Sequence, residues 1–159
     1  MNSGKSPPLL VLDTNVCLDL FFFRDPRWLQ LLEALQSGAV RAITRDDCRA
    51  EWQIVLTYPQ LGLQDDDRQR CMVQFDTLIT CVAKPETAIR RPLLPICSDG
   101  DDQKFLELAY DAKVDALITK DKALLKLSRK AAKHGLFAIV SPESWHQHWL
   151  QGSMQSVVA

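Results

Sequence analysis

The sequence lacks the short signatures of several large protein classes. Its five cysteines include no Cys-x-x-Cys pair, which argues against a zinc knuckle and against a disulfide framework. It contains no GxxxxGK[ST] loop, no GxGxxG fingerprint and no nucleophile elbow, so NTPase, dinucleotide-binding and α/β-hydrolase domains lack their necessary parts. Of its three histidines, His146 and His148 are two apart in an expected helix and point to different sides. A metal site in this chain would therefore use carboxylate ligands.

Long charge-free runs and a strong net charge are also missing. The net charge is -1, so the total charge excludes neither nucleic-acid nor protein partners. No charge-free window approaches about 18 residues, and Asp13, Asn15 and Asp19 interrupt the apolar start, with no small-residue cleavage site after it. We therefore expect neither a membrane span nor a signal peptide. The scattered cysteines favour a reducing environment and a cytoplasmic location.

The length and composition fit one folded domain. The chain has 159 residues, of which 47% are hydrophobic and 25% charged, and a chain of this length can bury a core without disulfides. No internal repeat or long linker divides it. We expect a single domain over residues 9–151, with flexible tails at residues 1–8 and 152–159.

Short apolar runs alternate with segments of helical period. Helical spacing of apolar residues covers residues 25–38, 45–56, 65–83 and 99–113 and continues after residue 121 and after residue 141. This alternation predicts a three-layer α/β/α sandwich with a mostly parallel central sheet. The predicted strands are Leu9–Leu12, Val40–Thr44, Asp115–Thr119 and Leu136–Val140.

Four acidic residues fall where such a sheet binds ligands, beyond the carboxyl ends of its strands. Asp13 directly follows the first predicted strand, and Asp121 follows the third by two residues. Asp102 lies in the first turn of the helix before that third strand. Glu51 lies beside the apolar stripe of its helix and can reach the edge of the core. We expect the four carboxylates to converge.

Converging carboxylates need a compensating charge, because like charges a few ångströms apart cannot all stay ionised. Ligand oxygens alone favour Mg²⁺ or Mn²⁺ over zinc. Such a site suits phosphodiester hydrolysis, since a bound metal polarises the phosphoryl oxygen and lowers the pKa of a water. Asn15 and Thr119 would be supporting groups of this site. Residues two apart in an extended chain face the same way, so the Thr119 hydroxyl could lie beside Asp121.

Each acid also has a purely structural explanation. Asp13 and Asp121 could cap the helices that follow them, and Asp101 and Asp102 could complement a helix dipole. Glu51 could be a solvated helix residue. The four together, rather than any one of them, favour the metal-site interpretation.

At these residues the chain resembles a PIN-domain ribonuclease, especially the PIN-type toxins of toxin-antitoxin systems. The matching segments are "LLVLDTNV", "AEW" around Glu51, "DGDDQKFLELA" and "ALITKDKALL". Each segment is short, but the ordered set is specific, and the resemblance covers about residues 9–149.

The resemblance implies an endoribonuclease that cleaves RNA with Mg²⁺ or Mn²⁺. It also implies a homodimer and inhibition by a small antitoxin protein whose tail enters the cleft. Asp99 and Asp101 lie close to the third ligand position, so either Asp99 or Asp101 could share the role given to Asp102, and Asp99 is a possible metal ligand. The catalytic positions that the resemblance assigns are Asp13, Glu51, Asp102 and Asp121 as metal ligands, with Asn15 and Thr119 as polar helpers.

Basic residues near these acids could hold RNA phosphates. One set follows helical spacing after Asp121, and a second set lies within and after the second predicted strand. A solvated charged face is the alternative for both. The first set is Lys122, Lys126, Arg129, Lys130 and Lys133, and the second is Arg41, Arg45 and Arg49.

Two other functions remain open. An Mg²⁺-dependent phosphatase or response-regulator-like domain also uses strand-end aspartates, and it would need a strand-end lysine, for which Lys120 is the candidate. A PIN-like scaffold could bind RNA or a protein without cleaving, although the complete acidic set argues against it.

Overall fold

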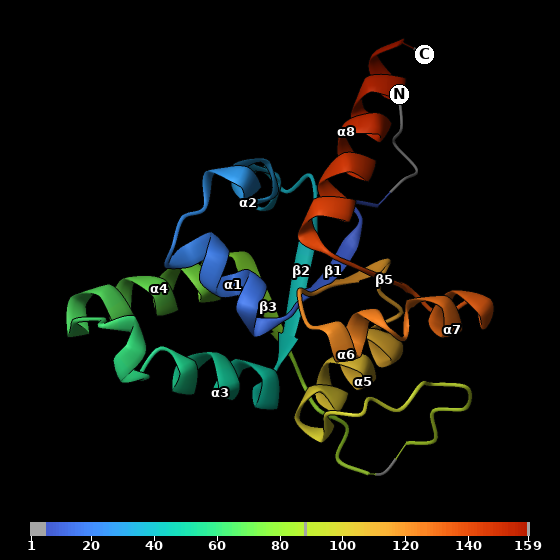
Figure 1. Cartoon of the computed structure of the whole chain (residues 1–159), viewed down its shortest axis with the longest axis horizontal. Helices are drawn as coiled ribbons and strands as arrows, with labels where there is room; N and C mark the ends of the chain where they lie inside the picture. Colours follow the sequence, from blue (N-terminus) through green and yellow to red (C-terminus); the bar gives the residue numbers. More distant parts are fainter. Residues whose placement is uncertain (1–5, 88, 159) are drawn as a thin grey trace.

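A computed structural model of the chain describes residues 6–87 and 89–158, with side chains through residue 151. Within these residues five parallel strands form one sheet in the order β3-β2-β1-β4-β5 (Figure 1). The chain first builds the sheet outward from β1 through β2 to β3 and then returns to the other side of β1, so the strand order reverses between β1 and β4. The strands are β1 (Leu9–Leu12), β2 (Arg41–Arg45), β3 (Ile79–Val82), β4 (Ala116–Ile118) and β5 (Ala138–Val140).

Helices cover both faces of the sheet, which confirms the predicted three-layer α/β/α sandwich. Leu10 and Leu12 of β1 belong to one apolar cluster and Val11 to the other, as alternation along a strand requires. In Figure 1, α1, α2 and α4 lie on one side of the strands and α5, α6 and α7 on the other. The helices are α1 (Thr14–Phe21), α2 (Leu29–Ser37), α3 (Asp46–Val55), α4 (Asp65–Leu78), α5 (Gln103–Ala112), α6 (Lys122–Leu125), α7 (Ser128–Lys133) and α8 (Pro142–Val158), with 3-10 turns η1 (Pro26–Trp28), η2 (Pro59–Leu61) and η3 (Gly100–Asp102).

The helix predicted over residues 65–83 was wrong at its C-terminal end. Helix α4 ends at Leu78, and Ile79 has an extended backbone with φ of -121° and ψ of 119°. Ile79 is the first residue of β3, which pairs with β2 in the register Ala42 to Ile79. Ile79, Thr80 and Val82 are β-branched, which favours a strand, but an apolar run this short has no period that separates it from a helix.

Other boundaries differ by smaller amounts. Strand β1 is as predicted, whereas β2 begins one residue later and β4 and β5 are shorter than predicted. The basic segment after Asp121 forms two short helices, α6 and α7, instead of one, because the chain turns at Lys126 and Leu127.

The expected tails are only partly described. Residues 1–5 and 159 lie outside the described residues, and the backbone of α8 continues through Val158, past the expected boundary at residue 151. The domain limits therefore remain a prediction. Among the described helices, none combines the length and apolar character that crossing a bilayer requires.

Three aromatic rings join the helices on one face of the sheet. Phe21 of α1 contacts Trp52 of α3 and Phe75 of α4 edge-on, with ring centroids 6.0 and 6.2 Å apart. Trp52 and Phe75 stack at 5.3 Å. All three are buried, so this cluster fixes α3 against α1 and thereby sets the position of Glu51 relative to Asp13.

Truncating the aromatic cluster should destabilise the fold. We expect Phe75→Ala to lower the free energy of unfolding by about 3 to 5 kcal/mol, through lost burial and the cavity left behind. Urea unfolding followed by circular dichroism measures it. The matched control is Phe23→Ala, whose side chain is 57% exposed and should change stability by no more than about 0.5 kcal/mol. Equal effects of the two substitutions would contradict the assignment of the core.

Candidate metal centre

The candidate site is built at the carboxyl ends of β1 and β4. These strands pair in parallel, with Leu12 opposite Ile118, so the residues that follow them lie side by side. The Asp13 amide donates to the Ile118 carbonyl oxygen at 3.0 Å and extends this pairing by one residue. The site therefore lies where the strand order reverses, which is where open α/β sheets bind ligands.

Asp13 is buried at this edge, with 4% of its surface exposed. Its Oδ1 accepts from the Thr14 amide at 2.7 Å, so Asp13 caps α1. Its Oδ2 accepts from the Thr119 hydroxyl at 2.7 Å and from Asn15 Nδ2 at 3.2 Å. Burial raises the pKa of Asp13, while the hydrogen bonds from Thr119 and Thr14 act in the opposite direction. Asp13 of the "DTN" segment is therefore both the cap of α1 and a member of the acidic group.

Thr119 links the first acid to Asp121. The Thr119 hydroxyl donates to Asp13 and accepts from the Asp121 amide at 2.9 Å. The Asp121 side chain accepts from the Ala123 amide at 2.7 Å and caps α6. The two polar helper positions expected from the sequence, Asn15 and Thr119, therefore both contact Asp13 directly.

Asp99, Asp102 and Asp121 form the tightest acidic group. Each offers one carboxylate oxygen, and these oxygens all lie within 4.8 Å of one another. Asp99 caps η3 by accepting from the Asp101 amide at 3.1 Å, and η3 turns Asp102 inward just before α5 begins. Asp101 is itself exposed and outside the group. Of the two acids near the third position, the structure thus brings Asp99, and not Asp101, to Asp102.

Asp102 is the acid of this group whose negative charge is least compensated by the described protein groups. It is 8% exposed, and its Oδ2 is buried without a hydrogen-bond partner among the described residues. Burial, a hydrogen bond with Asp121 and the charges of Asp13, Asp121 and Asp99 together raise the pKa of Asp102 to about 7. A cation would satisfy the orphaned oxygen and offset the repulsion. The all-oxygen donor set fits Mg²⁺ or Mn²⁺.

Glu51 lies at the edge of the acidic group but is already paired. The Thr14 hydroxyl donates to Glu51 Oε2, and Lys104 Nζ of α5 lies 2.9 Å from Oε1. The charge of Glu51 contributes to the raised pKa of Asp13, so the two carboxylates are electrostatically coupled. All four predicted acids therefore converge, with Glu51 held by protein donors.

Sequence reasoning did not assign Thr14 or Lys104 to the site. Thr14 stands inside the "DTN" segment, where its hydroxyl gave no signal beyond helix capping. Lys104 is 53 residues from its partner Glu51, and only the packing of α5 against α3 brings the two together.

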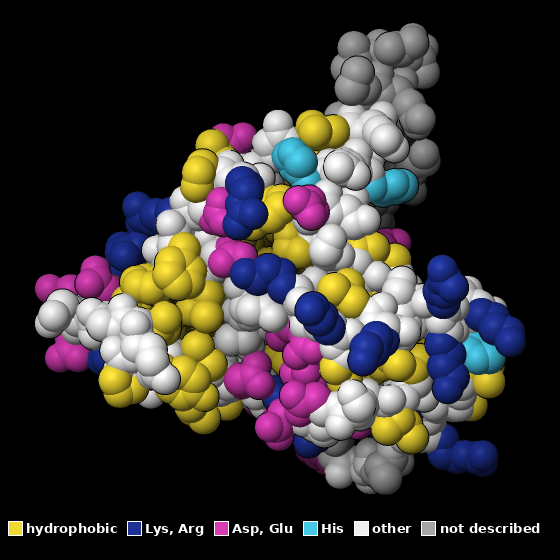
Figure 2. Space-filling model, in the orientation of Figure 1, with side chains coloured by type: hydrophobic (Ala, Val, Ile, Leu, Met, Phe, Trp, Pro, Cys, Tyr) yellow, Lys and Arg dark blue, Asp and Glu magenta, His cyan; other side chains and the backbone are white. Residues whose placement is uncertain are grey.

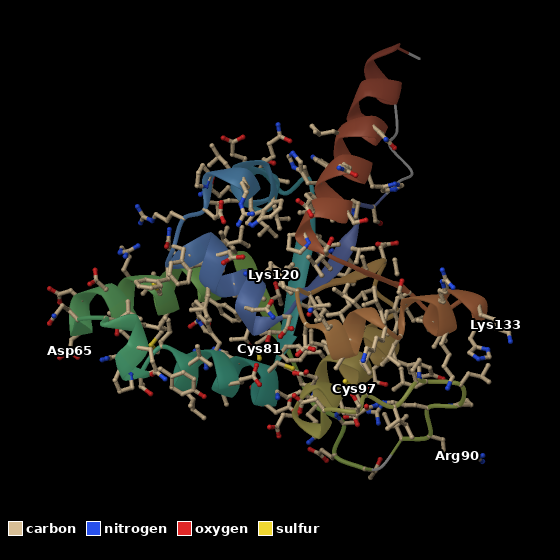
Figure 3. The ribbon with its side chains drawn as sticks, viewed as in Figure 1. Asp65, Cys81, Arg90, Cys97, Lys120 and Lys133 are labelled. Carbon is tan, nitrogen blue, oxygen red and sulfur yellow. The ribbon has the colours of Figure 1, made fainter. Side chains whose placement is uncertain are left out.

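Basic side chains extend from the acidic group toward α7. Figure 2 shows an acidic patch near the centre of this face, with Lys and Arg side chains beside it and toward one end of the molecule. Figure 3 places Lys120 near the centre and Lys133 at the far end of α7. The exposed members of the predicted set are Lys122, Lys126, Arg129, Lys130 and Lys133.

In the second basic set, Arg45 and Arg49 are paired with carboxylates, whereas Arg41 is exposed at the start of β2. Arg45 is 1% exposed, and its guanidinium binds Asp47 at 2.9 and 2.8 Å and Glu107 at 3.1 Å. It cannot reach a nucleic-acid backbone without leaving these carboxylates, so its expected role as an RNA contact is corrected to a structural one. Arg49 is more exposed but pairs with Asp76 at 2.7 Å.

The fold and site define an α/β/α domain with an all-parallel sheet and, at its strand-order reversal, an acidic edge whose carboxylates can hold a metal ion. The chain belongs to the PIN domain family, whose model, described as PIN domain, matches residues 9–123. That range contains every acid of the site. PIN domains are generally nucleases that use divalent metals. No curated protein matches the chain.

Neutralising Asp102 should stabilise the metal-free protein. The pKa of Asp102 is about 7 in the folded state and about 3.8 in the unfolded chain, so the folded state holds this proton more tightly. The contribution of Asp102 to the free energy of unfolding therefore falls as the pH rises from about 4 to about 7. We expect metal-free Asp102→Asn to melt higher than wild type at pH 8, by about 2 to 4 °C per kcal/mol of relieved repulsion, and the difference to vanish near pH 4.

Thermal melts in EDTA across this pH range measure the effect. The matched control is Asp66→Asn, an exposed acid of α4, which should show no such pH-dependent difference. Added Mn²⁺ should stabilise wild type and not Asp102→Asn, because only a cation bound to the folded state raises the melting temperature. Identical pH profiles for wild type and Asp102→Asn would refute the assignment.

Proposed function

We propose that the chain is a divalent-metal-dependent endoribonuclease that hydrolyses RNA phosphodiester bonds with Mg²⁺ or Mn²⁺. The observation that carries this proposal is the convergence of Asp99, Asp102 and Asp121, whose oxygens lie within 4.8 Å of one another beside buried Asp13. The orphaned Oδ2 of Asp102 favours a bound cation over a set of solvated acids.

The cation would be held by Asp99, Asp102 and Asp121, with Asp13 completing the acidic edge. A divalent cation supplies Lewis acidity there, lowering the pKa of a water and neutralising charge on the phosphoryl group. The Thr119 hydroxyl joins the Asp13 carboxylate, to which it donates, to the Asp121 backbone amide, from which it accepts.

Asp102 would also bind and release a proton at this edge. With a pKa of about 7, Asp102 holds a proton on part of the metal-free molecules at neutral pH. Cation binding would release this proton, so affinity should rise with pH through this range. Asn15 donates to Asp13 Oδ2 and accepts from the Lys120 amide at 3.4 Å, which fixes the segment after β4 against the start of α1.

The phosphatase alternative is less well supported. Lys120 follows β4, where such an enzyme would need a lysine, but its Nζ pairs with buried Asp19 of α1 at 2.7 Å. Its ammonium is thus engaged with α1, and the match to the PIN domain family favours phosphodiester substrates.

The biological setting is proposed on the resemblance to PIN-type toxins. We infer a cytoplasmic toxin that acts as a homodimer and is inhibited by a small antitoxin protein. The ordered segments at residues 9–16 and 99–125 support this assignment. Co-expression with a neighbouring small gene product, followed by affinity capture, would test the partner.

RNA cleavage tests the central proposal. We expect the purified chain to cut a mixed single-stranded RNA pool in Mn²⁺ or Mg²⁺ and to be inactive in EDTA. Asp121→Asn should lower the cleavage rate by at least about a hundredfold, because it removes a carboxylate from the cation's ligand set. Gel analysis of end-labelled RNA measures the rate.

Controls separate this activity from the alternatives. Asp66→Asn should cleave as wild type does, and a phosphomonoester should release no phosphate under the same conditions. RNA left intact with every divalent cation, by a folded protein, would overturn the nuclease proposal. RNA binding that persists in EDTA without cleavage would favour a non-cleaving scaffold.

Two exposed lysines, Lys122 in α6 and Lys126 directly after it, should bind RNA phosphates. We expect Lys122→Ala/Lys126→Ala to weaken RNA binding similarly for all sequences and to reduce the salt dependence by about 0.7 in slope for each lost contact. Lys133→Ala, at the far end of α7, is the control (Figure 3). Fluorescence anisotropy in Ca²⁺ at several salt concentrations measures both. An unchanged salt slope in the double variant would identify α6 as a solvated face only.

A further inference from the structure

Lys104 is a cation inside the acidic site that the proposed hydrolysis does not use. It belongs to α5, two residues after Asp102, and its side chain is mostly buried. Its Nζ lies 2.9 Å from Glu51 Oε1 and also donates to the Asp101 carbonyl oxygen. The ammonium is thus held between α3 and η3 at the rim of the carboxylate group.

The ammonium is paired within the protein, because its Nζ lies 2.9 Å from the Glu51 carboxylate and the Lys104 side chain is 18% exposed. The ring of Phe105 also lies beneath Nζ, at 5.2 Å from the ring centroid.

Each carboxylate oxygen of Glu51 already accepts from a protein donor. Oε1 is paired with Lys104, and Oε2 accepts from the Thr14 hydroxyl. Asp102 differs, because its Oδ2 has no donor among the described residues. The acidic edge is therefore divided into an open part, Asp99, Asp102 and Asp121, and a part at Glu51 that already has its counter-ion.

We propose that Lys104 is a positioning residue that serves as a built-in counter-ion for Glu51 and limits the centre to one divalent cation. This inference rests on the proposed function, since it concerns the cation that the same acids would hold. A second cation near Glu51 would have to displace the ammonium, because two positive ions at one carboxylate repel each other strongly in a partly buried site.

Metal stoichiometry tests this role without any measurement of activity. Mn²⁺ is titrated into the full chain at fixed pH, with free Mn²⁺ followed by electron paramagnetic resonance and binding heat by calorimetry. We expect wild type to bind one Mn²⁺ and Lys104→Met, which keeps the aliphatic stem, to bind two. The first Mn²⁺ should bind Lys104→Met about tenfold more tightly, because a nearby positive charge is gone.

Two further variants isolate the charge from the packing. Lys104→Arg should retain a stoichiometry of one, since its guanidinium can still pair with Glu51. Lys104→Met/Glu51→Gln should return to one, since the carboxylate that recruits the second cation is lost. Lys104→Gln repeats the charge removal with a polar side chain in case the Met variant does not fold, which thermal melts would reveal.

The outcomes separate this inference from the nuclease proposal. Two Mn²⁺ ions bound to wild type, or one ion with unchanged affinity in both Lys104→Met and Lys104→Gln, would overturn the counter-ion role while leaving metal-dependent cleavage intact. Wild type that binds no Mn²⁺ and cleaves no RNA would overturn both. Two sites in the charge-removed variants and one in Lys104→Arg would establish it.

Discussion

The parallel pairing of β1 with β4 places the residues after each strand at one buried edge, and the acidic contacts described above depend on it. Asp13 and Asp121 come from distant parts of the sequence, yet one hydroxyl, that of Thr119, touches both residues. Burial raises the pKa values of Asp13 and Asp102, and the neighbouring carboxylates raise them further, so gathering these acids carries an electrostatic cost. The protein tolerates this cost because the apolar clusters on both faces of the sheet stabilise the fold that brings the acids together.

The same carboxylates also begin structural elements. Asp13 caps α1, Asp99 caps η3 and Asp121 caps α6, so each is oriented by a backbone amide before any ligand is present. Capping leaves lone pairs on the carboxylate oxygens, and these can point toward a shared centre. Preorganisation of this kind limits what remains to be ordered when a cation or an RNA phosphate binds. Lys104 adds a fixed positive charge at Glu51, where no helix terminus provides an amide.

Much of the fold was predictable because its signals are local. The apolar run before Asp13 marked β1 to the residue, and the alternation of strands and helices identified the layered class. The error at β3 has a physical origin, since four residues are too few to show a period and the pairing partner, β2, is remote in sequence. Arg45 was misjudged for a similar reason: a strand-end arginine looks like a surface cation until Asp47 and Glu107 are seen to enclose it.

The sequence alone determined the chemical nature of the site, because residue types and strand ends fix which oxygens can meet at the carboxyl edge of a parallel sheet. Only the tertiary structure decided how these oxygens are shared. It grouped Asp99 with Asp102 and Asp121, left one Asp102 oxygen without a donor, and gave Glu51 to Lys104. Such choices depend on the packing of α5 against α3 and on distances of a few ångströms, which residue spacing along the chain does not encode.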